Sequence, residues 1–315
     1  MLKTQRASSI LRIHKTLLNK SSIAPNDRYA ALTLLKACWS SSSGASQFDH
    51  RTSFKDVKPP APGWKLGAGL DTSLSEGALQ WKEDIQNSKR KTWDLTSMES
   101  MRDSYKLLTS AIIPRPIAFV STLSEDGVPN LAPFSYFSMV SANPPLLSVS
   151  FSLSPRRPKD TRENILKTKE FTVNIISEAF AEAANVTSAE SPASTDEWIL
   201  SGLTKESSTL VKPPFVRESA VSFECELYSS QDIGLPETSN PTTTLVLGLI
   251  KKVHVREGAL AEDGLSIDAA KLRPIARLGG KGYSRLTEGF ELPRVSWKES
   301  KEEYRRLADQ SSEKS

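Results

Sequence analysis

One segment near the middle of the chain carries side chains suited to binding an anion. Lys159, Asp160 and Thr161 open a stretch that predicts a helix over about 160–168. We expect Asp160 or Thr161 to cap this helix, because Glu163 follows at a capping-box-like spacing. The first amides of a helix point outward with partial positive charge, so a lysine and a hydroxyl beside them make a phosphate site. An ordinary exposed basic loop fits the same residues equally well.

A second segment, Asn130–Phe137, has small residues and a proline inside an aromatic strand. Such a strand lets a flat ligand approach the backbone closely, and Ser135 and the backbone amides can then serve the polar edge of that ligand. The alternative is simple core packing.

Two further segments could border a ligand. Arg115 stands between Pro114 and Pro116, so its backbone is stiff and its guanidinium is directed. A rigid exposed loop with a solvated arginine is the alternative. The segment Arg277–Tyr283 combines glycines with an aromatic ring, and such a loop can fold over a flat ring system. A surface turn is the alternative there.

Other kinds of chemistry find little support. There is no G-x-S-x-G segment, and His254 lies alone in a predicted strand between two valines, where we expect a structural role. The glycines at 279–282 lack the spacing of a phosphate-binding P-loop. Three histidines and two cysteines stand too far apart for metal-ligand spacing or a disulfide framework.

The positive charge of the chain is concentrated at its start. The net charge is +4, but residues 1–48 hold seven Lys or Arg against one acid, while the rest holds 34 basic and 36 acidic residues. This distribution argues against a nucleic-acid-binding domain. A basic, serine-rich, amphipathic start is typical of a mitochondrial transit peptide. A disordered tail is the alternative, and without a transit peptide a cytoplasmic location is expected.

The rest of the chain divides into three parts. Residues 49–100 are predicted to be a linker or N-terminal arm with a short helix around 78–90, and residues 298–315 a charged tail or helix. No stretch approaches the roughly 18 apolar residues of a membrane span. Between the arms, 101–297 reads as short β-rich runs joined by hairpins, with a helix at about 178–188, which suggests a six-stranded antiparallel barrel. The expected strands are 116–123, 130–142 (broken at Pro133), 146–151, 171–176, 220–228 and 243–256.

Taken together and in order, these segments resemble the flavin reductase-like family, whose fold is an FMN-binding split β-barrel of Greek-key type. The resemblance covers about residues 101–297 and rests on several ordered blocks, which are more specific together than any one alone. The blocks are IIPRPIAFVST (112–122), NLAPFSYFSMVSANPPLLSVSF (130–151), KDTRENI (159–165), EFTVNII (170–176), NPTTTLVLG (240–248) and KLRPIARLGGKGYSRL (271–286).

The resemblance implies an FMN-binding oxidoreductase in which electrons from NAD(P)H or another donor pass through the flavin to oxygen or a small acceptor. A non-catalytic protein that stores or delivers flavin is the alternative. The resemblance also implies FMN in preference to FAD, no catalytic acid or base, and a homodimer with flavin at the interface. The implied flavin-binding residues are Arg115, Asn130, Ala132, Pro133, Phe134, Ser135, Ser150, Phe151, Lys159, Asp160, Thr161, Gly279, Gly280 and Tyr283. Of these, the resemblance implies that the Arg115 segment and the loop 279–283 border the flavin partly from the neighbouring subunit.

Overall fold

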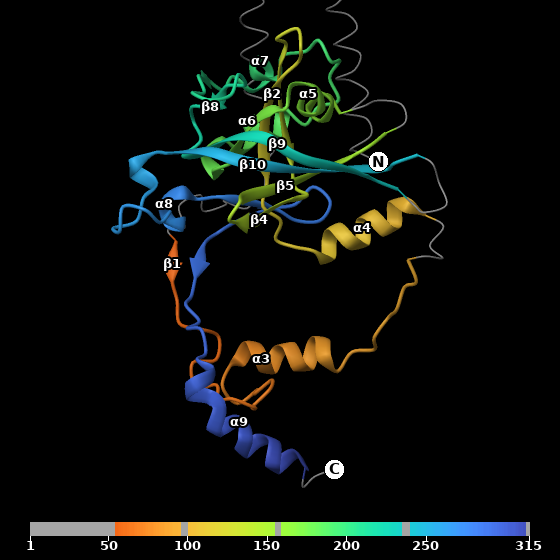
Figure 1. Ribbon diagram of the computed structural model, residues 1–315. Coiled ribbons are helices and arrows are strands. Elements are labelled where there is room, and N and C mark those ends of the chain that lie inside the picture. Colours follow the sequence, from red (N-terminus) through yellow and green to blue (C-terminus); the bar gives the residue numbers. More distant parts are fainter. Residues whose placement is uncertain (1–53, 96–99, 155–158, 235–239, 313–315) are drawn as a thin grey trace, which may run out of the picture. The chain divides into compact units, whose positions relative to one another are not determined.

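The computed structural model describes residues 54–95, 100–154, 159–234 and 240–312 (Figure 1). The predicted targeting segment, 1–48, lies outside these residues. Within the described part of the chain, no helix is long and apolar enough to cross a membrane. The prediction of a mainly β fold with a few helices is confirmed.

One seven-stranded antiparallel sheet forms the centre of the fold, and its strand order is β3-β2-β6-β9-β10-β5-β4. The two longest strands, β9 and β10, run side by side across Figure 1. The strands are β2 (Ala118–Leu123), β3 (Pro129–Phe134), β4 (Phe137–Ala142), β5 (Pro145–Ser152), β6 (Glu170–Ile175), β9 (Val221–Ile233) and β10 (Thr243–Val255).

The sheet has one strand more than predicted because the expected strand 130–142 is two strands. The chain leaves the ladder at Ser135 and Tyr136, two residues after the expected break at Pro133. Pro133 stays within β3, which is an edge strand, so its missing N–H removes no ladder hydrogen bond that the fold needs. The two-residue link joins the opposite edges of the sheet, and Ser150 N donates to Tyr136 O at 2.9 Å. The sheet therefore curls into an open barrel.

Helices and short strands surround this sheet. The predicted helix at 160–168 is confirmed as α5 (Asp160–Thr168). The helix expected at 178–188 is η2 (Glu178–Phe180) followed by α6 (Ala181–Val186). The other elements of the family-like region are α4 (Met101–Ala111), α7 (Glu197–Ser201), α8 (Ala269–Leu272), η3 (Glu257–Ala259), β7 (Lys205–Glu206), β8 (Phe215–Val216), β11 (Ile275–Arg277) and β12 (Tyr283–Arg285).

The N-terminal arm, from residue 54 onward, contacts the C-terminal part of the chain. β1 (Lys55–Asp56) pairs in parallel with β13 (Glu288–Gly289). Gly67 has a left-handed φ of +82°, and a Cβ at this position would stand 2.8 Å from Leu307. The remaining elements are α3 (Glu76–Trp81), which continues into η1 (Lys82–Gln86), and α9 (Trp297–Ser312).

Two clusters of buried apolar side chains hold the sheet together. The first lies inside the barrel and includes Phe151, Phe171 and Val246, all with no exposed surface. The second packs Phe119 and Leu131 against Phe180 and Trp198 of the helical segments. Burying an aromatic or branched side chain of this size contributes about 1.5–3 kcal/mol. The alternation of buried and half-buried residues along β5 follows from its pleat.

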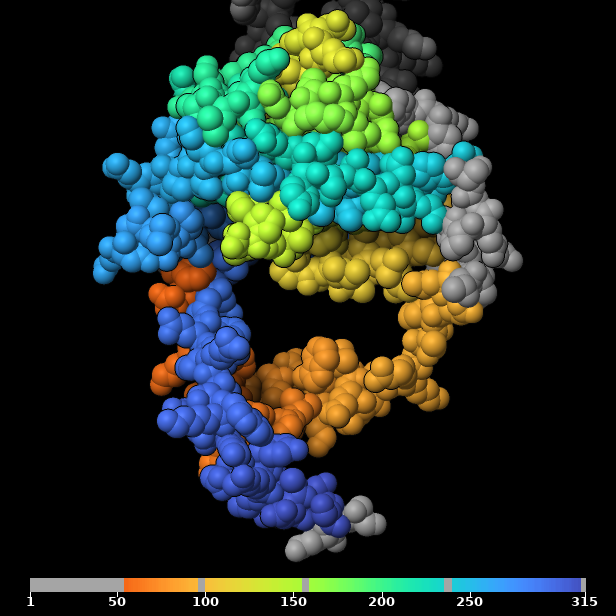
Figure 2. Space-filling view, in the orientation of Figure 1, coloured from red at the N-terminus to blue at the C-terminus, as the bar shows by residue number. Residues whose placement is uncertain are grey.

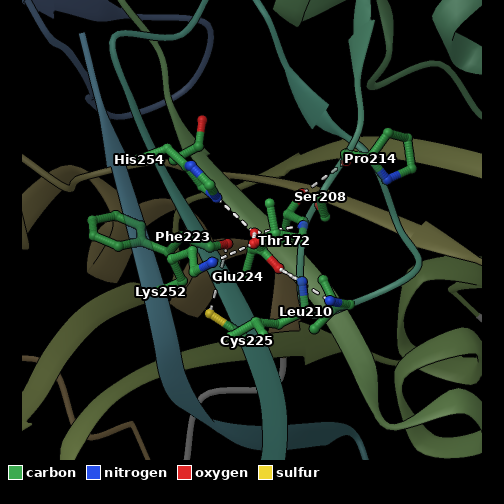
Figure 3. A network of polar contacts seen from close by, with 12 residues as sticks. Thr172, Ser208, Leu210, Pro214, Phe223, Glu224, Cys225, Lys252 and His254 are labelled. Carbon is green, nitrogen blue, oxygen red and sulfur yellow. Dashed lines mark hydrogen bonds and ion pairs between the residues drawn. The ribbon is translucent and has the colours of Figure 1, made fainter.

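A buried carboxylate fastens the loop before β8 to the sheet (Figure 3). Glu224 of β9 is fully buried. It accepts hydrogen bonds from the amides of Thr209, Leu210 and Val211 and from the Thr209 hydroxyl. The Nε2 atom of His254 lies 2.6 Å from Glu224 Oε1. The structural role expected for His254 is thus confirmed.

Candidate functional site

A cavity of about 710 Å³ opens along the edge of β3. Its walls come from β3, the end of β5, the start of α5 and the segment between α6 and α7. The volume falls within the range of small-molecule and cofactor sites. Nine of the predicted site residues line it: Asn130, Ala132, Pro133, Phe134, Ser135, Ser150, Lys159, Asp160 and Thr161.

One end of the cavity is the N-terminus of α5. The N-cap is Lys159, and none of the side chains that the structure describes caps this helix. The expected cap by Asp160 or Thr161 is therefore wrong: both belong to the first helical turn. The first amides of a helix have no intrahelical acceptor, so the uncapped start leaves these N–H groups available to a ligand. This is the arrangement of a helix-terminal anion site.

A buried hydrogen-bond network holds this end of the cavity in place. Asn130 Nδ2 donates to Thr161 Oγ1 at 2.8 Å and to Thr122 Oγ1 at 3.3 Å. Asn164 of α5 donates to the same Thr122 hydroxyl at 3.0 Å. All four residues are buried. Asn130 therefore acts as the link that fixes the start of α5 against β3.

The long wall of the cavity is β3 and the link that follows it. Consecutive residues from Ala132 to Tyr136 line the cavity, which shows that the edge of the strand, and not only one face, borders it. Phe134 packs edge-on against Phe151 at 4.7 Å between ring centroids. Burial raises the pKa of Tyr136, and neighbouring Tyr105 raises it further.

The opposite wall is formed by the end of β5. Side chains alternate between the two faces of this strand, and only those on one face border the cavity. Ser150 and Ser152 line the cavity. Phe151 points the other way and is fully buried in the barrel core. The structure does not place Phe151 on the cavity wall, because a residue between two cavity-facing neighbours in a strand faces the opposite side.

Arg115 joins three segments and does not line the cavity. Its guanidinium donates to the carbonyls of Thr109 at 2.5 Å, Ile112 at 2.8 Å and Leu278 at 3.0 Å. Its Nε donates to Ser135 Oγ at 3.4 Å. Arg115 is buried, so the alternative of a solvated arginine is wrong. It holds α4 and the turn after β11 beside the cavity residue Ser135.

The glycine-rich segment is the turn between β11 and β12, and it lies outside the cavity lining. A Cβ at Gly279 would stand 2.8 Å from Ser110 Cβ, so the missing side chain lets this turn pack on α4. Gly280 adopts a left-handed φ of +59°. The Tyr283 hydroxyl donates to Asn185 Oδ1 at 2.8 Å. The structure therefore does not bring Gly279, Gly280 and Tyr283 into the cavity.

The sequence analysis missed two parts of the cavity wall. One is Tyr105 on α4, and the other is the segment from Thr187 to Ser191 together with Glu197 of α7. Both helices carry start signals. Ser100 caps α4, and Asp196 caps α7, which ends at Gly202. These signals predict the helices but not the burial of Glu197.

Among the described residues, no group of three or more His, Cys, Asp or Glu side chains is placed to bind a metal ion. The cavity is therefore described by its helix start, its hydroxyl groups and its open strand edge. A curled antiparallel sheet with a cavity along its edge strand β3 defines a barrel protein with a candidate ligand site beside that strand.

The family model for the flavin reductase-like domain matches residues 110–276, which is more than half of the chain. The chain belongs to this family. An uncharacterized protein of Aquifex aeolicus is 41% identical over 180 residues, which span 57% of this chain and 88% of that protein. An uncharacterized Bacillus subtilis protein is 38% identical over 62% of this chain and 96% of its own length.

Solved structures agree with this assignment. Nitrilotriacetate monooxygenase component B from Bacillus cereus is 38% identical, with a TM-score of 0.62 over 65% of this chain and all of that one. Pseudomonas fluorescens 2-nitrobenzoate 2-nitroreductase is 27% identical, with a TM-score of 0.58 over 66% of this chain and 98% of that one. A Shewanella frigidimarina protein with a split barrel domain is 26% identical, with a TM-score of 0.55 over 66% of this chain and 99% of that one. The split-barrel fold is thereby confirmed.

Proposed function

We propose that the protein binds FMN in the cavity and acts as a flavin-dependent oxidoreductase. The observation that supports this most directly is the uncapped start of α5 at one end of a cavity whose long wall is an open strand edge. A phosphate suits the first feature and a flat ring system suits the second. Membership of the flavin reductase-like family supports flavin as the ligand.

The residues present fit an FMN molecule. The amides at the start of α5, the Thr161 hydroxyl and the Lys159 ammonium would hold the phosphate. The hydroxyls of Ser135, Ser150 and Ser152 offer donors and acceptors to a polyol chain and to the polar edge of a ring. FMN is favoured over FAD by the resemblance described above.

The chain's part in the reaction is binding and orientation. When bound, a flavin accepts hydride and passes electrons to oxygen or a small acceptor, so no protein acid or base is required. Asn130 keeps the helix start at the end of β3, and Arg115 keeps Ser135 in place. The two solved relatives named as a monooxygenase component and a nitroreductase support redox chemistry.

Mixing purified holoprotein with NADH or NADPH under anaerobic conditions tests the reductase activity. Bleaching of the flavin absorbance with either nucleotide is the expected result. A flavin that stays oxidised with both would contradict reduction by NAD(P)H. If the flavin were then also inert to dithionite-reduced electron carriers and dissociated readily, storage or delivery of flavin would replace the enzymatic function.

We further propose a homodimer that forms through α4. Met101, Tyr105 and Leu108 on this helix and Ile112 at its C-cap recur at helical spacing, and between 43% and 79% of each is exposed. The amber surface of α4 is open to view in Figure 2. An apolar stripe facing solvent marks an interaction surface. Because Tyr105 lines the cavity, a second copy seated on α4 would border the flavin.

We also propose that residues 1–48 direct the protein to mitochondria, on the basis of their composition. Fusing a fluorescent protein to the full chain and to a chain without these residues tests this. Mitochondrial signal from the full chain and cytosolic signal from the shortened one is expected. Mitochondrial signal from both would contradict the transit assignment.

A further inference from the structure

Glu197 is a buried acid on the wall of the cavity. It is the first residue of α7, and its neighbour Asp196 caps that helix through Trp198 N at 3.0 Å. Capping by Asp196 leaves the Glu197 side chain free for other contacts. Only 4% of Glu197 is exposed, although it lines the cavity. Burying an acid costs free energy unless its oxygens are hydrogen-bonded.

Each oxygen of Glu197 has a donor, one from β3 and the other from the segment before α7. Oε2 accepts from the backbone amide of Leu131, in β3, at 3.4 Å. Oε1 accepts from the Ser191 hydroxyl at 2.6 Å. Both oxygens of the side chain are thus engaged by the protein. Glu197 therefore ties the segment before α7 to the cavity edge of β3.

The charge of Glu197 has no cationic partner close by among the described residues. Its oxygens contact an amide and a hydroxyl, whereas neighbouring Asp196 has an ion pair with Lys205 at 2.7 Å. The described cavity lining holds one cation, Lys159, against Asp160, Glu190 and Glu197. Of these three acids, Glu197 alone is buried. Because Glu197 is buried, water and salt screen its charge only weakly, and the electric field of this charge extends across the cavity.

We propose that Glu197 tunes the redox balance of the bound flavin by disfavouring the reduced form. This inference rests on the proposed function. Reduction of a flavin to its anionic hydroquinone adds a negative charge to a ligand that shares the cavity with a buried carboxylate. Like charges in one low-dielectric site repel, so the cavity binds oxidised FMN more tightly than reduced FMN. A reduced flavin that is disfavoured in this way gives its electrons readily to an acceptor.

The test measures the dissociation constants of oxidised and of reduced FMN for three forms of the protein: wild type, Glu197→Gln and Glu218→Gln. The glutamine can still accept from Leu131 N and can donate to Ser191, so the wall contacts persist without the charge. We expect Glu197→Gln to bring the two constants closer by about tenfold, which is a rise in two-electron potential of about 30 mV.

Glu218 is the matched control, because it accepts the Thr204 amide at 3.1 Å but is exposed and outside the cavity. Glu218→Gln should leave the ratio of the two constants unchanged. An unchanged ratio in Glu197→Gln would overturn the inference while FMN binding itself stands. A wild-type protein that binds neither form of FMN would overturn the proposed function and this inference with it.

A second variant covers the case in which Glu197→Gln does not fold. Ser191→Ala removes one donor and keeps the carboxylate, so the charge is less neutralised. The ratio of the two constants should then shift in the opposite direction, with reduced FMN bound still more weakly. A shift toward tighter binding of reduced FMN, or no shift, would contradict a role for the Glu197 charge.

Discussion

Lys159 is the side chain on which the proposed phosphate contact depends most, because it is the N-cap residue of α5 and lines the cavity. Lys159→Ala should weaken FMN binding by about 1–3 kcal/mol, the range for losing a charge-assisted hydrogen bond. Quenching of FMN fluorescence during titration measures the affinity. Lys167, an exposed lysine in the last turn of the same helix, is the control. Equal affinity in wild type and Lys159→Ala would place the phosphate elsewhere.

Glu224 makes stability depend on pH. Burial raises the pKa of its carboxyl, but hydrogen bonds from Thr209, His254 and Leu210 outweigh burial and lower it from 4.5 to about 2. A lowered folded-state pKa stabilises the fold above the unfolded value, and the gain is lost as pH falls from about 4.5 toward 2. The gain at neutral pH is about 3 kcal/mol.

Urea unfolding of wild type and Glu224→Gln between pH 2 and pH 7 measures this contribution. The free energy of unfolding should differ most above pH 5, and the difference should narrow as the pH approaches 2. The same comparison in a His254→Ala background would show how much of the difference depends on the contact between His254 and Glu224. A difference that stays constant from pH 2 to pH 7 would show that the Glu224 charge does not stabilise the loop before β8.

At the scale of elements, the sequence predicts what local patterns determine. The helix at 160–168 and the strands β5, β6, β9 and β10 follow from hydrophobic periodicity and turn residues. Local patterns do not predict the position of the break after β3. Ser135 and Tyr136 leave the ladder because the chain passes there from one edge strand of the sheet to the other, and this depends on the tertiary structure. Helix α4 is not predicted, because residues from 101 onward are interpreted as β-rich, although the apolar residues of this helix recur at helical spacing.

The residues of the candidate site divide in the same way, into those that local sequence predicts and those that tertiary structure positions. The cavity end at the start of α5 and the β3 wall are predictable, because a helix start and small residues in an aromatic strand are recognisable from the local sequence. The resemblance implies Phe151 as a flavin-binding residue, whereas the alternation of side chains along β5 turns it into the barrel core. The hydrogen bond from Arg115 to Leu278 and the packing of Gly279 on Ser110 depend on tertiary structure, so local patterns do not predict them.

Gly248 in β10 gives an element-scale prediction. The ladder with β9 shifts register at this residue, and a Cβ there would stand 2.4 Å from the ring of Phe171. Gly248→Ala should destabilise the fold by about 1–3 kcal/mol through overpacking. Phe171→Leu replaces the ring that the new methyl group meets with a smaller side chain. The double variant should therefore lose less unfolding free energy than the sum of the losses in the two single variants. Additive losses in urea unfolding would argue against a direct clash.

At the scale of the whole molecule, the α4 stripe predicts the oligomeric state. Ile112→Glu places a charge in the stripe, so light scattering after gel filtration should show monomers in place of dimers, with an unchanged circular dichroism spectrum. Ile199, which is 80% exposed on α7, supplies the control: Ile199→Glu should remain dimeric. A dimer that survives Ile112→Glu would place the interface on another surface.

The most direct test of the account is the absorption spectrum of the purified full-length protein, followed by identification and counting of the released flavin. The structure's single uncapped helix start within the described cavity predicts a yellow protein, or a colourless one that turns yellow with added FMN, with one FMN per chain. A protein that remains colourless in excess FMN, or that releases FAD, would contradict it.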